Sequence, residues 1–166
     1  MKSKMSGLCE GFSTALSIEL SGRKFYLECA KRTANKDGKA MFNFLASEER
    51  LHYDKINELY QKENDTGRCD YVGISCKEPG VFGGNIPGVT LNDKSDALDA
   101  LNVGVKAEER SIELYGRLAG EAPNEKLRKF FEKLVGEERR HLMILETEVE
   151  FVMDTGEFHD FKTVTM

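Results

Sequence analysis

The chain has 166 residues, of which 40% are hydrophobic and 32% charged, and its net charge of −5 gives no reason to expect nucleic acid or an anionic membrane as a partner. No run approaches 18 consecutive apolar residues, and the N-terminal stretch MKSKMSGLCEGF has no apolar signal region. We therefore expect a cytoplasmic protein with a single domain over residues 1–166.

Apolar residues at helical spacing predict two helices in the first part of the chain, over about residues 9–33 and 38–63. The stretch ANKDG between them breaks the pattern, and Asp37 is the expected N-cap of the second helix. Because the joint is short, these helices should form an antiparallel hairpin.

The next segment, about residues 64–92, contains six glycines and two of the three prolines of the chain. A helix of 25 residues is about 37 Å long, so a link of this length can follow a helix and return the chain to the end where it began. Cys69 and Cys76 lie in this segment without the CxxC spacing of paired-cysteine metal sites. We expect a long crossover here.

A second hairpin is predicted over about residues 93–120 and 124–154, with Asp93 and Asn124 as expected caps. Two antiparallel helix hairpins joined by one long crossover make an all-α, ferritin-like four-helix bundle.

The two hairpins are copies of one another in sequence. An offset of 89 residues carries Glu49 to Glu138 and His52 to His141, so the motif Glu-x-x-His occurs twice in register. Such self-similarity predicts a bundle with approximate two-fold symmetry. Further pairs at the same offset are Glu19 and Glu108, Tyr26 and Tyr115, Asn35 and Asn124, and Glu48 and Glu137.

The repeated acidic residues fall on apolar helix faces. Glutamate and histidine three positions apart share one helix face, and each motif lies within a stripe of apolar residues. Four inward carboxylates are untenable without positive charge, and no lysine or arginine occupies corresponding core positions. Two divalent metal ions would neutralise them, and carboxylate with imidazole favours iron or manganese. The predicted ligands are Glu19, Glu49, His52, Glu108, Glu138 and His141.

Other polar residues have less specific patterns. Tyr26 and Tyr115 follow the lone glutamates by seven residues, so each is either a core tyrosine or a hydroxyl donor to a ligating carboxylate. His159 lacks a matching Glu-x-x partner and is interpreted as structural or solvated. Three glutamates next to predicted ligands point about 100° away from them and are interpreted as surface groups or as neighbours of the ligands, namely Glu48, Glu109 and Glu137.

The ligand pattern, the long crossover and the stretches IELSGRKFY and AEERSIELY resemble the rubrerythrin-like branch of the ferritin-like superfamily, over about residues 9–154. The resemblance implies a non-haem di-iron oxidoreductase, often a homodimer, that reduces hydrogen peroxide with electrons from rubredoxin. No rubredoxin module with paired CxxC motifs occurs in this sequence, so we expect a separate donor protein. Rubrerythrins also carry an exchangeable glutamate three residues after the third-helix ligand, where this chain has Ser111.

The leading functional hypothesis is thus a peroxidase with two iron ions. Manganese or a mixed metal pair is the alternative cofactor. Oxidation of ferrous iron by O₂ is the alternative reaction, and a metal-binding or redox-sensing protein without turnover is the hypothesis from a different class.

Overall fold

The computed structural model describes residues 4–65 and 94–161. They form four helices: α1 (Lys4–Arg32), α2 (Lys36–Asp65), α3 (Lys94–Glu121) and α4 (Glu125–Thr155). The predicted all-α bundle of two helix hairpins is confirmed. The predicted crossover lies outside the described residues apart from its first two positions, which are still part of α2, so Cys69, Cys76 and the expected cap Asp93 have no structural account.

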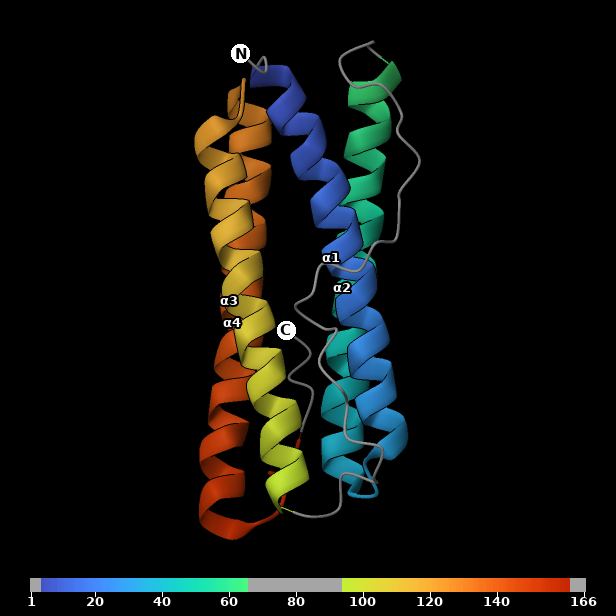
Figure 1. Ribbon diagram of the computed structural model, residues 1–166, viewed down its shortest axis with the longest axis vertical. Coiled ribbons are helices and arrows are strands. Elements are labelled where there is room, and N and C mark those ends of the chain that lie inside the picture. Colours follow the sequence, from blue (N-terminus) through green and yellow to red (C-terminus); the bar gives the residue numbers. More distant parts are fainter. Residues whose placement is uncertain (1–3, 66–93, 162–166) are drawn as a thin grey trace.

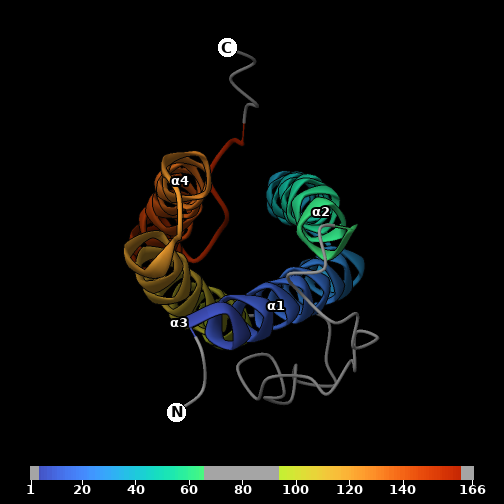
Figure 2. The same ribbon diagram turned by 90° about the horizontal axis from the view of Figure 1, so that it is seen from above.

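Each hairpin is antiparallel, and α3 begins at the end of the bundle opposite to the end of α2 (Figure 1). α1 packs against both α2 and α3, and α3 packs against α4. Seen from above, the helices follow the order α2, α1, α3, α4 around an arc, with α2 and α4 on facing sides (Figure 2). No helix among the described residues is long and apolar enough to cross a membrane.

Asparagine side chains begin the second helix of each hairpin. Oδ1 of Asn124 accepts a hydrogen bond from the backbone N of Leu127 at 2.9 Å, as predicted for this cap. The prediction for Asp37 is wrong, because Oδ1 of Asn35 accepts from the backbone N atoms of Asp37 and Gly38 at 2.9 and 3.0 Å. Asp37 instead lies in the first turn of α2, where its negative charge interacts favourably with the helix dipole.

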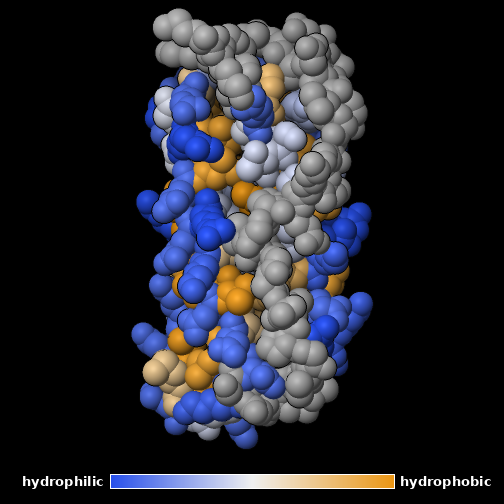
Figure 3. All heavy atoms as spheres, in the orientation of Figure 1, coloured by the Kyte–Doolittle hydropathy of each residue, from blue (hydrophilic) through white to orange (hydrophobic). Residues whose placement is uncertain are grey.

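The apolar core forms two clusters separated by a polar layer. One cluster contains Phe12, Tyr60 and Phe131, and the other contains Phe42 and Leu145. Burying a large apolar side chain contributes about 1.5–3 kcal/mol, so these clusters can offset the cost of polar groups between them. On the face shown in Figure 3, hydrophilic side chains cover the flanks and hydrophobic atoms appear between them.

The residues after α4 pack back on the bundle. Gly156 takes a left-handed conformation with φ of 77°, which ends α4 and redirects the chain. Phe158 then packs edge-on against Phe42, with ring centroids 5.9 Å apart. The backbone N of His159 donates to Oε1 of Glu148 at 2.6 Å, and the His159 side chain itself is exposed.

Candidate metal centre

The polar layer brings the two Glu-x-x-His motifs together. Glu49 and His52 come from α2, and Glu138 and His141 come from α4. All four are buried, with at most 4% of their surface exposed, and one candidate ligand atom from each lies within 4.8 Å of the others. The repeated motifs therefore meet in one cluster.

Glu138 lies between the two imidazoles. Its Oε1 is 2.9 Å from Nδ1 of His52, and its Oε2 is 3.0 Å from Nδ1 of His141. Oε1 of Glu49 is 3.5 Å from the same nitrogen of His141. The imidazole rings are nearly parallel, with centroids 5.3 Å apart. Both histidines thus direct Nδ1 toward the carboxylates, leaving Nε2 on the outer side.

The lone glutamates complete the layer from α1 and α3. Oε2 of Glu19 is 3.6 Å from Nδ1 of His52, and Oε1 of Glu108 is 3.9 Å from Nδ1 of His141. Both glutamates are almost fully buried. The structure therefore gathers all six predicted ligands, and their roles toward metal stay a prediction.

The two tyrosines hold these glutamates by crossing between hairpins. The hydroxyl of Tyr115 on α3 donates to Oε1 of Glu19 on α1, and that of Tyr26 on α1 donates to Oε1 of Glu108 on α3. Burial raises the pKa of both tyrosines well above the ordinary value, and nearby carboxylates raise it further. Each hydroxyl thus keeps its proton and can orient a carboxylate.

The neighbouring glutamates on α2 and α4 reach the outer nitrogens of the histidines. Oε2 of Glu137 is 3.0 Å from Nε2 of His52, whereas Oε2 of Glu48 is 3.8 Å from Nε2 of His141. Glu109 is exposed on the surface. The contact between Glu137 and His52 joins two different helices, so it could not be predicted from the residue spacing within one helix.

The pKa values of the glutamates in the cluster are shifted in opposite directions. Burial raises the pKa of Glu49 and Glu108 well above the usual range, and neighbouring carboxylates add to the shift. Burial also disfavours the charged form of Glu138, but contacts with the two histidines outweigh it and hold its pKa well below the usual range. Without metal, the layer therefore holds protons on some carboxyl groups and charge on others.

The imidazoles supply the positive charge of the metal-free cluster. Burial alone lowers the pKa of His52, but contacts with Glu137, Glu138 and Glu19 raise it to about 12. Burial likewise lowers the pKa of His141, and contacts with its carboxylate neighbours raise it to about 10. Binding of divalent ions at Nδ1 would replace these protons.

The unsatisfied atoms of the layer fit metal ions. In the part of the chain that the structure describes, eight buried side-chain N and O atoms form no hydrogen bond, and all belong to this layer. Native proteins satisfy most buried polar groups, so such a concentration needs an explanation. Oxygen and imidazole donors without thiolate suit iron or manganese. The unsatisfied atoms belong to Glu19, Glu49, His52, Glu137, Glu138 and His141.

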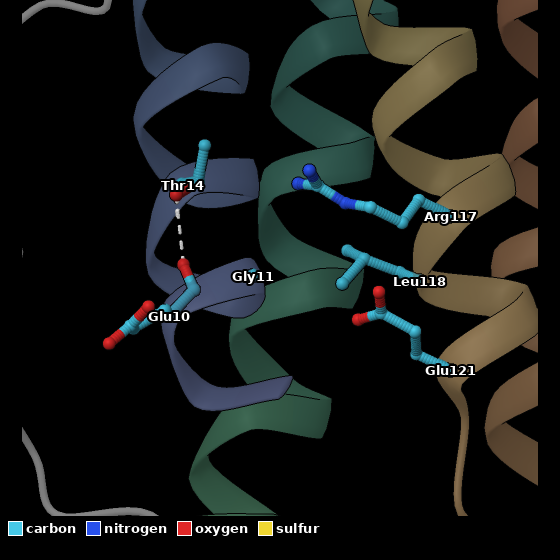
Figure 4. Close-up of a pocket in the computed structure, with 6 residues that line it drawn as sticks. All are labelled: Glu10, Gly11, Thr14, Arg117, Leu118 and Glu121. Carbon is cyan, nitrogen blue, oxygen red and sulfur yellow. Dashed lines mark hydrogen bonds between the residues drawn. The ribbon is translucent and has the colours of Figure 1, made fainter. Parts of the chain in front are cut away.

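One surface pocket lies apart from this layer, between the N-terminal part of α1 and the C-terminal part of α3. Side chains of Arg117, Leu118 and Glu121 project toward α1 there (Figure 4). Gly11 leaves room for Leu118 to approach α1 closely. None of the lining residues is a predicted ligand.

A family model described as Rubrerythrin matches residues 10–149. The chain belongs to the rubrerythrin family. In this rubrerythrin-family chain, the buried cluster of Glu49, His52, Glu138 and His141 is compatible with a di-iron centre. A solved structure of a hypothetical protein from Pyrococcus furiosus is similar in fold, with a TM-score of 0.72 and 24% identity, covering 92% of this chain and 93% of that one. No curated protein matches the chain.

Proposed function

We propose that this protein is a non-haem di-iron oxidoreductase that reduces hydrogen peroxide to water, using electrons from a separate donor protein such as rubredoxin. The observation that carries the proposal is the buried layer in which both Glu-x-x-His motifs direct unsatisfied oxygen and nitrogen atoms toward one another. Membership of the rubrerythrin family supports the same chemistry.

The residues of the layer have distinct parts in this proposal. Glu49, Glu138 and both histidines would hold the ions from α2 and α4, and Glu19 and Glu108 would hold them from α1 and α3. Two iron ions bound there would supply two electrons, which with two protons convert one hydrogen peroxide molecule to two water molecules. The tyrosine hydroxyls keep the lone glutamates oriented, and the apolar clusters on both sides exclude bulk water.

Metal content tests the site before any activity is measured. The purified protein loaded anaerobically with ferrous iron should retain about two ions per chain. Replacing Glu49 or Glu138 by Ala should remove at least one ion, because it withdraws both a charge and a donor. Full metal content after replacement of Glu19, Glu49, Glu108 and Glu138 together would refute the assignment.

The choice of oxidant tests the reaction. The anaerobically reduced protein should be oxidised faster by stoichiometric peroxide than by a comparable amount of O₂, measured by stopped-flow absorption after mixing with either oxidant. Rubredoxin and its reductase should then sustain peroxide consumption. Faster reaction with O₂ and continued oxidation of added ferrous iron would favour a ferroxidase, and a loaded protein inert to both would favour binding or sensing. The homodimer and the cytoplasmic location remain predictions.

A further inference from the structure

The two halves of the cluster differ just outside the predicted ligands. Glu48 and Glu137 are counterparts at the offset of 89, and each faces the outer nitrogen of a histidine on the opposite helix. The distance from Glu137 Oε2 to His52 Nε2 is 3.0 Å, and that from Glu48 Oε2 to His141 Nε2 is 3.8 Å. Only the first distance is short enough for a hydrogen bond, and neither atom of that pair forms one in this arrangement. The Glu137 side chain is also less exposed, at 12% against 27%.

Lysines accompany only the closer of these contacts. Nζ of Lys55 on α2 is 3.6 Å from Oε2 of Glu137, and Nζ of Lys133 on α4 is 3.9 Å from Oε1. At the offset of 89, the counterparts of these lysines are the apolar residues Ile144 and Phe44. The duplicated sequence thus places cations beside one outer glutamate and apolar side chains at the matching positions of the other half.

Two effects of this difference act in opposite directions on a bound cation. The lysine charges repel it, but the lysine side chains are 43% and 70% exposed, so solvent and salt screen them. A carboxylate at the outer nitrogen of a ligating imidazole fixes the ring and its tautomer, and loss of such a partner typically weakens metal binding by about 10–100-fold. Positioning should therefore outweigh repulsion, in favour of the half that contains His52.

We propose that Glu137, held by Lys55, is a positioning residue that makes the His52 half of the metal centre bind its ion more tightly than the His141 half. The proposal rests on the metal site of the proposed function and is independent of the reaction that the metal supports. Its consequence is sequential filling, with the first divalent ion taken up on the His52 side.

Cobalt(II) titration of the metal-free protein tests this, with visible absorption as the readout and a competing chelator to set the free ion concentration. The wild-type protein should bind in two steps, and His52→Ala should remove the tighter step. Glu137→Gln should weaken the tighter step by about 10–100-fold. The matched variant Glu48→Gln should leave it within a few-fold. Lys55→Met should reproduce part of the Glu137→Gln effect without altering any predicted ligand.

The outcomes separate this proposal from the one on which it rests. Two bound ions with equal effects of Glu137→Gln and Glu48→Gln, or no effect of either, would overturn the unequal halves and leave the metal site intact. Failure of the wild-type protein to bind cobalt would overturn the metal site and the inequality together. Circular dichroism of each metal-free variant checks folding, and Lys55→Met still decides the matter if Glu137→Gln does not fold.

Discussion

Removal of the metal should make the stability of the bundle depend on pH, with a maximum at mildly acid pH. Burial raises the pKa of Glu49 and Glu108, so the folded metal-free protein keeps protons that the unfolded chain releases above about pH 4.5. The raised pKa values of His52 and His141, about 12 and about 10, have the same effect above pH 6.5. Where the folded state binds more protons, the free energy of unfolding falls as pH rises.

The acid side of the maximum comes from carboxylates with lowered pKa. Contact with His52 lowers the pKa of Glu137 to about 2, although burial opposes it, so this contribution is lost as pH falls from 4.5 toward 2. For each group whose pKa is raised on folding, stability falls by about 1.4 kcal/mol per pH unit between the unfolded-state pKa and the folded-state pKa. For a domain of this size, that corresponds to about 3–6 °C in Tm per pH unit for each such group.

Calorimetry of the metal-free and metal-loaded proteins between pH 5 and pH 8 measures this dependence. Bound divalent ions replace the protons, so the gain in Tm on loading should grow with pH. An ion present at 100 times its Kd adds about 2.7 kcal/mol. The metal-free double variant Glu49→Gln, Glu108→Gln should show a shallower decline, because its amides do not titrate. A metal-free Tm that is constant or rises from pH 5 to pH 8 would refute the reasoning.

Three further changes test other parts of the structure. Tyr26→Phe removes the hydroxyl that orients a buried carboxylate, so metal affinity in a chelator competition should fall by about 10–100-fold. Burial raises the pKa of Glu148, so its ionisation lowers the stability of the wild-type protein as pH rises above 4.5. In urea denaturation, the Glu148→Gln variant should therefore be more stable than the wild-type protein at pH 7. This difference should vanish below pH 4.5. A Cβ at Gly38 would lie 2.7 Å from Cγ of Phe158, so Gly38→Ala should destabilise by about 1–3 kcal/mol. The control Gly136→Ala adds its methyl to open space within α4 and should stabilise by about 0.5–1 kcal/mol.

Features that depend on one helix at a time could be predicted from the sequence. The spacing of Glu49 and His52 fixes a shared helix face, and the apolar stripe around them fixes the direction of that face. The offset of 89 then assigns the same geometry to Glu138 and His141. These two steps require no knowledge of how the helices cross, which is why the six residues could be predicted from the sequence. The structure places all six in one buried layer.

Features set by helix ends and by contacts between helices could not be predicted in the same way. α1 begins at Lys4, five residues before the predicted start at about residue 9. The offset of 89 pairs Asn35 with the predicted cap Asn124 and therefore indicates Asn35 as the cap of α2. The stretch ANKDG also contains Asp37, a common cap residue, which led to the wrong prediction. Glu148 continues the buried stripe of α4 and could have been found by its spacing; its partner, the backbone N of His159, depends on the path of the chain after α4.

The polar contacts of the layer also explain how the two hairpins are held together. Within each hairpin, the helices pack along their length, and between hairpins the packed pair is α1 and α3. The helices α2 and α4, which lie on facing sides, meet through the cluster, where His52 contacts Glu138 and His141 contacts Glu49. Ions bound by these side chains would join α2 to α4, so metal binding and the association of the hairpins are coupled. The buried carboxylates destabilise the metal-free bundle at neutral pH. Once metal is bound, the same carboxylates would link the two hairpins.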